Sequence, residues 1–238
     1  RIITDLKNSG KKVVLVSSGA IGVGMSKLGM TERPQCVKEK QAIAAVGQCE
    51  LMSIYDRLFS EYGTVVAQIL LTKDVLTSKE RNENIINTFD VLLEKGIIPI
   101  VNENDSISID EIKFGDNDTL SAIVSKIVNA STLIILSDID GLYNKNPREF
   151  SDAEIIHEVN DITEEIENMA SGAGSSKGTG GMITKITAAK MATEAGCDVI
   201  DTAISCFSGG TAQPATETME YVLRQYGYET GLDLDCLK

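Results

Sequence analysis

Five short segments concentrate the glycine, carboxylate, amide and hydroxyl groups that could bind or transfer a polar group. They cover residues 17–24, 102–105, 115–118, 137–143 and 177–185. Glycines let a ligand approach the backbone, and free N–H groups at the start of a helix attract anions. The single histidine, His157, lies in an Ile-Ile-His-Glu-Val run typical of a strand or a surface position. The sequence therefore disfavours histidine-dependent chemistry and favours the binding of anionic groups.

The first segment, Ser-Ser-Gly-Ala-Ile-Gly-Val-Gly at residues 17–24, follows an apolar run of strand length at 12–16. A glycine-bearing turn that opens a helix is a suitable anion site. It is not an ordinary P-loop, because the pattern G-x-x-x-x-G-K-[ST] is absent from this segment. One alternative stays open, in which the glycines serve only the close packing of a helix on a strand.

The second segment, Asn-Glu-Asn-Asp at residues 102–105, follows the apolar run 97–101. Open parallel sheets bind their ligands at the carboxyl ends of the strands, so Asp105 is placed to meet an ammonium or hydroxyl group. Asn and Asp also favour turns, and a polar junction between strand and turn is the alternative.

The third segment, Gly-Asp-Asn-Asp at residues 115–118, follows an alternating stretch at 106–114 that predicts a small hairpin. Either Asn117 or Asp118 could simply cap the helix that comes next. Three polar side chains beside the acid at the end of a strand exceed what one cap requires. We therefore predict that this segment belongs to a substrate site together with Asp105.

The fourth segment, residues 137–143, begins at the end of the apolar run 132–136 and contains Ser137, Asp138 and Tyr143. A strand end, a tight turn and an aromatic ring form a plausible shelf for a nucleotide base and ribose. A calcium loop is excluded because the closing glutamate and the remaining spacing are absent. A turn without a ligand is the alternative.

The fifth segment, Lys-Gly-Thr-Gly-Gly-Met-Ile-Thr-Lys at residues 177–185, is a glycine turn that leads into a helix. Lys185 falls in the first turn of that helix, where the positive end of the helix dipole disfavours a cation. A bound phosphate would reverse this penalty, although a solvated lysine is the alternative. The segment therefore predicts a phosphate site.

The elements that must position these segments alternate between strand and helix, which predicts an α/β fold with a mainly parallel sheet sandwiched by helices. The predicted strands cover residues 12–16, 65–71, 97–101, 132–136 and 198–204. The predicted helices cover residues 38–62, with a break near Gly47, and 78–95, 119–128 and 182–195. Residues 1–8 are already helix-like, so we expect a first strand upstream of the sequence given.

Composition restricts the class of partner. The 238 residues carry a formal net charge of −13, which opposes binding to nucleic acid or an acidic membrane surface. Apolar runs are too short to cross a bilayer and nothing resembles a signal peptide. Five scattered cysteines without a C-x-x-C spacing indicate neither a disulfide framework nor a zinc site. We expect a cytoplasmic protein with small-molecule partners.

Taken together, these segments resemble the amino acid kinase family across residues 11 to about 198. The resemblance rests on motifs that occur in the family's order: SSGAI from residue 17, AAVGQ from 44, QILLT from 68, NEND from 102, GDND from 115, SD from 137 and GTGGM from 178. It implies one domain over residues 1–200 that transfers a phosphoryl group from ATP, with Mg²⁺, to the γ-carboxylate of L-glutamate in proline biosynthesis.

The resemblance also implies roles for individual residues. Substrate binding falls to Ser18, Asp105 and Asn117, and catalysis to Lys185 and Asp118, with Asp118 orienting the catalytic lysines. Lys113 and Asp116 would lie on the same substrate side. ATP binding falls to Ser137, Asp138, Thr179, Gly180, Gly181, Met182, Ile183, Thr184 and Lys185. The family further implies a homo-oligomer, in which the predicted helix 38–62 could take part, and proline as a feedback inhibitor.

Two departures from the family limit these expectations. The family begins with a strand and a glycine-rich loop that carries a further catalytic lysine, and we expect that region to precede Arg1. The tail at 201–238, with its Ser-Gly-Gly-Thr around Thr211, instead resembles biotin-dependent carboxyltransferases and suggests a chimeric junction. About 40 residues cannot form a (β/α)₈ barrel. A ligand-binding fragment without activity, or a related kinase with another substrate, therefore stays open as an alternative.

Overall fold

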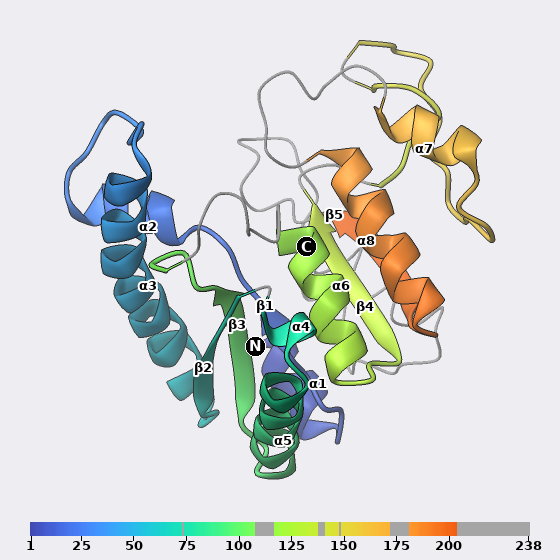
Figure 1. The fold of residues 1–238 in the computed structure, drawn as a ribbon. Coiled ribbons are helices and arrows are strands. Elements are labelled where there is room, and N and C mark those ends of the chain that lie inside the picture. The colour runs from blue at the N-terminus through green and yellow to red at the C-terminus, as the bar shows by residue number, and fades with distance from the viewer. Residues whose placement is uncertain (73, 108–116, 138–140, 148, 172–180, 204–238) are drawn as a thin grey trace. The chain divides into compact units, whose positions relative to one another are not determined.

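The computed structural model describes residues 1–72, 74–107, 117–137, 141–147, 149–171 and 181–203. The chain divides into two compact units, Arg1–Leu120 and Ser121–Lys238, and each is described by itself. Figure 1 shows the course of the chain. The carboxyltransferase-like tail lies almost wholly outside the described residues, so the domain boundary near residue 200 stays a prediction.

The first unit contains a three-stranded parallel sheet in the order β1-β3-β2. The strands are β1 (Leu15–Val16), β2 (Val66–Leu71) and β3 (Ile98–Glu103). Ile100 of β3 pairs in register with Leu15 on one side and Gln68 on the other. The central strand is buried along almost its whole length, as expected for a parallel strand covered on both faces.

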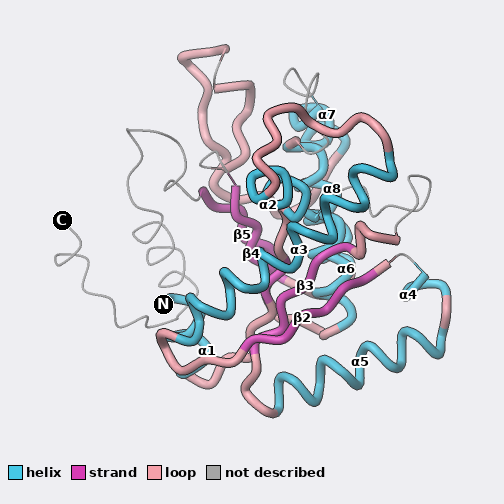
Figure 2. The backbone as a smooth tube through the Cα atoms, turned by 90° about the vertical axis from the view of Figure 1, so that its left-hand side faces the viewer, coloured by secondary structure: helices cyan, strands magenta, loops and turns pink. Residues whose placement is uncertain are grey.

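Helices cover both faces of this sheet. They are α1 (Ile2–Asn8), α2 (Ala20–Lys27), α3 (Val37–Ser60), α4 (Asp74–Thr77) and α5 (Lys79–Glu94). Figure 2 shows β2 and β3 lying between α3 and α5. Phe59 of α3 packs with Ile98 and Ile100 of β3 in the apolar core under α3. At the start of α5 the Ser78 hydroxyl accepts a hydrogen bond from the Arg81 N–H at 3.4 Å, which satisfies one of the free donors of that helix.

Helices α2 and α3 approach each other closely at two glycines. A Cβ atom placed on Gly47 would lie 1.7 Å from the carbonyl oxygen of Ala20, and one on Gly24 would lie 2.2 Å from that of Ile43. The predicted break near Gly47 is wrong, because α3 continues through this residue without interruption. The missing side chain of Gly47 serves contact between two helix backbones rather than a bend in one helix.

The second unit is built on a parallel pair of strands, β4 (Thr132–Ser137) and β5 (Asp198–Ala203). Figure 1 shows α8 (Met182–Glu194) and α6 (Asn117–Ile127) side by side along β4. Ala122 of α6 and Ala188 of α8 meet Ile135 of β4 in one buried cluster. The small alanine side chains let both helices lie close to the sheet.

The predicted α/β class with parallel strands is confirmed. Of the predicted strand at 12–16, only Leu15–Val16 pairs with a neighbour. The predicted hairpin at 106–114 lies mostly outside the described residues. The helix predicted at 119–128 begins two residues earlier, at Asn117. Two helices were not predicted, the short α4 and the acidic α7 (Glu164–Ser171). No described helix combines the length and the apolar character needed to cross a membrane.

Candidate functional site

A cavity of about 420 Å³ lies in the first unit, where β2 and β3 end beside α2 and α3. Its lining residues are Ala20, Ala44, Ala45, Gln48, Cys49, Met52, Gln68, Leu70, Glu103, Asn104, Asp105 and Ser106. Small alanines and a methionine form its apolar part, and amides and carboxylates from the end of β3 form its polar part. This combination suits a small, polar, partly aliphatic ligand.

The cavity contains the acid that the sequence predicted at this end of the sheet. Asp105 and Glu103 are both half-buried at its rim, so two carboxylates bring negative charge to one side. Among the described residues that line the cavity, none is a lysine or an arginine. The cavity is therefore better suited to an ammonium group at this side than to an unaccompanied anion.

The other two predicted substrate residues, Ser18 and Asn117, are not among the residues that line the cavity. Ser18 is exposed in the turn between β1 and α2, whereas its neighbour Ser17 is buried and hydrogen-bonds through Oγ to the Tyr55 hydroxyl at 2.8 Å. Asn117 and Asp118 form the first turn of α6. The acidic side chain of Asp118 is favourable there because the N-terminal end of a helix dipole is positive.

Asn102 and Gln48 form a hydrogen-bonded pair of side chains at the cavity, and this pair was not predicted from the sequence. The Asn102 side chain accepts a hydrogen bond from the Glu103 N–H at 2.9 Å and donates one to Gln48 Oε1 at 2.9 Å. Gln48 lines the cavity, and its Nε2 group is buried without a hydrogen-bond partner among the described residues. The signal in the sequence that could have identified Gln48 is its position on the buried face of α3, one turn after Ala44.

The turn after β1 has the backbone geometry that the glycine pattern suggested. Gly19 is the residue before α2 and adopts φ +94°, a left-handed conformation that strains other residue types. This conformation lets the chain pass directly from β1 into α2. The glycines of the segment thus serve two needs, since Gly24 makes the close contact with α3 and Gly19 makes the turn.

In the second unit, the predicted nucleotide residue Ser137 lies at the carboxyl end of β4. It is buried, and its Oγ has no hydrogen-bond partner in the described part of the chain. A buried hydroxyl without a partner carries an energetic cost that a bound polar group would remove. Position and burial together make Ser137 a candidate contact for a ligand.

At the start of α8, the side chain of Thr184 caps the backbone of Gly181. The Thr184 hydroxyl accepts a hydrogen bond from the Gly181 N–H at 3.2 Å and donates one to the Gly181 carbonyl at 2.7 Å. Lys185 is half-buried one residue further along, still within the first turn. Met182 and Ile183 pack into an apolar cluster around Ile186, so any ligand contact of theirs is through the backbone N–H.

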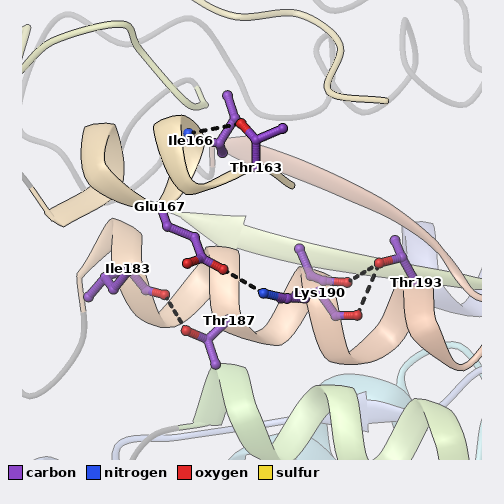
Figure 3. A network of polar contacts seen from close by, with 8 residues as sticks. Thr163, Ile166, Glu167, Ile183, Thr187, Lys190 and Thr193 are labelled. Carbon is purple, nitrogen blue, oxygen red and sulfur yellow. Dashed lines mark hydrogen bonds and ion pairs between the residues drawn. The ribbon is translucent and has the colours of Figure 1, made fainter. Parts of the chain in front are cut away.

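Polar contacts at the surface of α8 include one ion pair to α7 (Figure 3). Lys190 donates a hydrogen bond to Glu167 of α7 at 2.7 Å, and this bond raises the pKa of the Lys190 ammonium. The hydroxyl groups of Thr187 and Thr193 bond back to carbonyls of their own helix. The Lys190–Glu167 pair lies on the exposed side of α8, whereas the apolar cluster around Ile186 packs α7 with α8.

Several predicted residues lie outside the described part of the chain. They are Lys113, Asp116, Asp138, Thr179 and Gly180. Their roles stay predictions. The described residues also contain no group of three or more His, Cys, Asp or Glu side chains placed to hold a metal ion.

Comparison with known proteins gives consistent matches. The model of the amino acid kinase family matches residues 1–201. A glutamate 5-kinase of Clostridium perfringens is 63% identical over 204 residues, which cover 84% of this chain and 76% of that protein. A glutamate 5-kinase of Clostridium acetobutylicum is 58% identical over 200 residues, which cover 84% of this chain and 75% of that protein.

Solved structures show a similar fold at low sequence identity. An isopentenyl phosphate kinase structure has a TM-score of 0.55 and 14% identity, with 88% of this chain and 82% of that chain covered. At this identity the likeness concerns the fold alone. It supports the parallel α/β arrangement described above.

Proposed function

The chain belongs to the amino acid kinase family, and we propose that it transfers the γ-phosphoryl group of ATP to the γ-carboxylate of L-glutamate. The product is glutamyl 5-phosphate, and the reaction is the first step of proline biosynthesis. The observation that carries the proposal is the 63% identity to a glutamate 5-kinase over 204 residues. The cavity supports it, because its carboxylates suit the ammonium group of an amino acid.

The chemistry needs no general base. A glutamate side chain has a pKa of about 4.3, so it is an ionised nucleophile at neutral pH. One γ-carboxylate oxygen forms a bond to the γ-phosphorus while the bond from that phosphorus to the β,γ-bridging oxygen breaks, and ADP leaves with the electron pair. The protein has to align two anions and neutralise the charge on the phosphoryl oxygens.

The residues divide between these two tasks. In the proposal, Asp105 holds the ammonium group of glutamate, while Ser18 and Asn117 complete the substrate site. Asp118 orients the catalytic lysines. Lys185 stabilises the phosphoryl group in transfer, because a cation in the first turn of a helix is favourable once a phosphate is bound nearby.

In the proposal, ATP binds the polar groups of the second unit. The unpartnered hydroxyl of Ser137 is available to the nucleotide, and the backbone N–H groups of Met182 and Ile183, in the first turn of α8, face its phosphates in the proposal. Asp138, Thr179 and Gly180 complete this site in the proposal. Mg²⁺ would arrive bound to the ATP phosphates with several of its water ligands retained, and would neutralise charge there. This mode of binding does not require a preformed cluster of acidic side chains.

Glutamate-dependent ADP release tests the proposal. The purified chain is incubated with Mg·ATP and L-glutamate, and ADP is measured by a coupled assay. Trapping with hydroxylamine, which converts the acyl phosphate to a hydroxamate, identifies the product. Release that instead depends on aspartate, carbamate or UMP would assign the chain to a different substrate. Nucleotide binding without turnover of any of these would identify a binding protein without kinase activity.

Three further proposals come from the family resemblance. The chain forms a homo-oligomer, it works in the cytoplasm, and proline inhibits it by feedback. Light scattering tests the first. Titration of the glutamate-dependent rate with proline tests the last, with alanine as the control amino acid.

Cysteine labelling tests where glutamate binds. Cys49 is exposed and lines the cavity, Cys36 is exposed outside it, and Cys197 is buried with a thiol pKa that burial raises. We expect iodoacetamide to modify Cys49 and Cys36 quickly and Cys197 slowly, because the thiolate reacts. Glutamate at about ten times its Kd should slow labelling of Cys49 about tenfold. Peptide mass spectrometry measures each site.

Cys36 is the internal control for this experiment. Its labelling rate should be the same with and without glutamate. Equal protection of Cys49 and Cys36, or protection of neither, would place the glutamate site away from the cavity. As the pH rises, Cys197 should remain the slowest of the three, because a raised pKa keeps its thiol protonated to higher pH.

A further inference from the structure

Gln48 is buried, with 9% of its surface exposed, yet its side-chain nitrogen has no hydrogen-bond partner among the described residues. A buried amide donor without a partner costs about 1–3 kcal/mol, so folded proteins rarely retain one without a reason. Gln48 also lines the cavity beside Asp105. The residue that carries the unused donor therefore belongs to the wall of the cavity where the proposed substrate would bind.

The hydrogen bonds around Gln48 fix which end of its amide is unused. The Glu103 backbone N–H can only donate, so the Asn102 atom that receives it at 2.9 Å must be the oxygen Oδ1. Asn102 Nδ2 therefore faces Gln48 and donates to Oε1 at 2.9 Å. The two N–H bonds of Gln48 Nε2 are then left to point elsewhere. The backbone thus sets the orientation of both amides.

We propose that Gln48 Nε2 donates a hydrogen bond to the α-carboxylate of the amino acid substrate and so selects for a free α-carboxylate. This inference rests on the proposed function. Glu103 and Asp105 at the cavity attract an ammonium group, and in an amino acid the α-carboxylate is attached to the same carbon as the ammonium. The described lining offers no lysine or arginine for that carboxylate, and Gln48 is a neutral donor within this lining.

The α-carboxylate fits Gln48 better than the reacting γ-carboxylate does. The γ-carboxylate has to remain open to ATP for in-line attack on the phosphorus. Gln48 is almost completely buried, and its oxygen is held by Asn102. A deep donor with a fixed orientation suits the end of the substrate that does not react. Asn102 is a positioning residue in this scheme, because it acts through Gln48.

Two substitutions separate the effect of the hydrogen-bond donor on binding from the effect of the side-chain shape. Gln48→Met keeps a similar volume and removes the donor, while Gln48→Glu replaces the donor with an acceptor. Gln41→Glu is the matched control, since it makes the same change two turns earlier in α3, outside the cavity lining. Circular dichroism and thermal melting establish that each variant is folded. Calorimetry then measures the affinity for L-glutamate and for isoglutamine, whose α-carboxylate is an amide.

We expect Gln48→Met to weaken glutamate binding about 10- to 100-fold, the range for a hydrogen bond to a charged group. KM for glutamate should rise in parallel while KM for ATP stays unchanged. The wild type should prefer glutamate to isoglutamine. Gln48→Glu should weaken or reverse this preference, because its carboxylate repels the α-carboxylate and accepts from an α-amide. General damage to the cavity would not produce such a reversal.

The possible results separate the proposed role of Gln48 from the proposed kinase function on which it rests. A wild-type chain that binds neither ligand would overturn both. A wild type that phosphorylates glutamate, with folded Gln48 variants that keep its KM and its preference over isoglutamine, would overturn the role of Gln48 alone. Loss of affinity in Gln41→Glu equal to that in Gln48→Glu would also overturn it, since the effect would then arise from added charge on α3.

Discussion

Lys185→Met should lower kcat for glutamate phosphorylation at least about 100-fold, the size of effect seen when one group that stabilises transition-state charge is removed. The side chain of Lys185 begins in the first turn of α8, where the helix dipole disfavours a cation in the absence of a phosphate. KM for glutamate should change little, because the lysine acts on the phosphoryl group. Steady-state rates at saturating ATP provide the measurement.

Lys190→Met is the matched control for this prediction. It makes the same substitution in the same helix, but Lys190 contacts Glu167 of α7 on the exposed side. Exposed ion pairs contribute little, so kcat should stay within about twofold of the wild type. Equal kcat for Lys185→Met and wild type would remove Lys185 from the proposed mechanism, whatever the control does.

Gly47→Ala should destabilise the protein by about 3 kcal/mol, at the upper end of the usual range for overpacking. The added Cβ would lie 1.7 Å from the carbonyl oxygen of Ala20 and 2.5 Å from the Gly24 nitrogen. Both are backbone atoms, so rotation of a side chain cannot relieve the clash and α2 must move away from α3. Urea unfolding followed by circular dichroism measures the loss.

Gly22→Ala is the control for Gly47→Ala. Gly22 lies in α2 with nothing within 4 Å of the position its Cβ would take. Alanine has the higher helix propensity, so this variant should be more stable by about 0.5–1 kcal/mol. Because Ala20 lines the cavity, Gly47→Ala should also raise KM for glutamate. A Gly47→Ala protein as stable as wild type would show that α2 and α3 can separate at no cost.

The strands could be predicted from the sequence because apolar runs mark buried parallel strands directly. The run 132–136 became β4, Thr132–Ser137, with a shift of one residue. The position of Asp105 at the cavity also followed, because chain order alone places it after β3. The start of α6 was predicted less accurately, because residue type alone does not show whether Asn117 caps the helix or lies in its first turn.

The roles of Gly47 and Gln48 could not be predicted because both depend on a second helix or strand. A glycine inside a helical pattern indicates either a break or a close contact, and only the position of Ala20 decides between them. Gln48 was part of a recognised motif, but its unused donor becomes visible only once the hydrogen bond from Asn102 is known. Contacts between residues 54 positions apart in sequence lie outside any local pattern.

The contact between α2 and α3 also limits how the substrate range of this protein can change. Next to Ala20 and Ala44, which line the cavity, two helix backbones are in contact at Gly24 and Gly47, and neither glycine accepts a larger residue without displacing the facing helix. Mutation or directed evolution therefore has little freedom to enlarge or refill the cavity from that side. Variants with a new amino acid substrate should accumulate changes at Gln48, Gln68 and the residues after β3 instead.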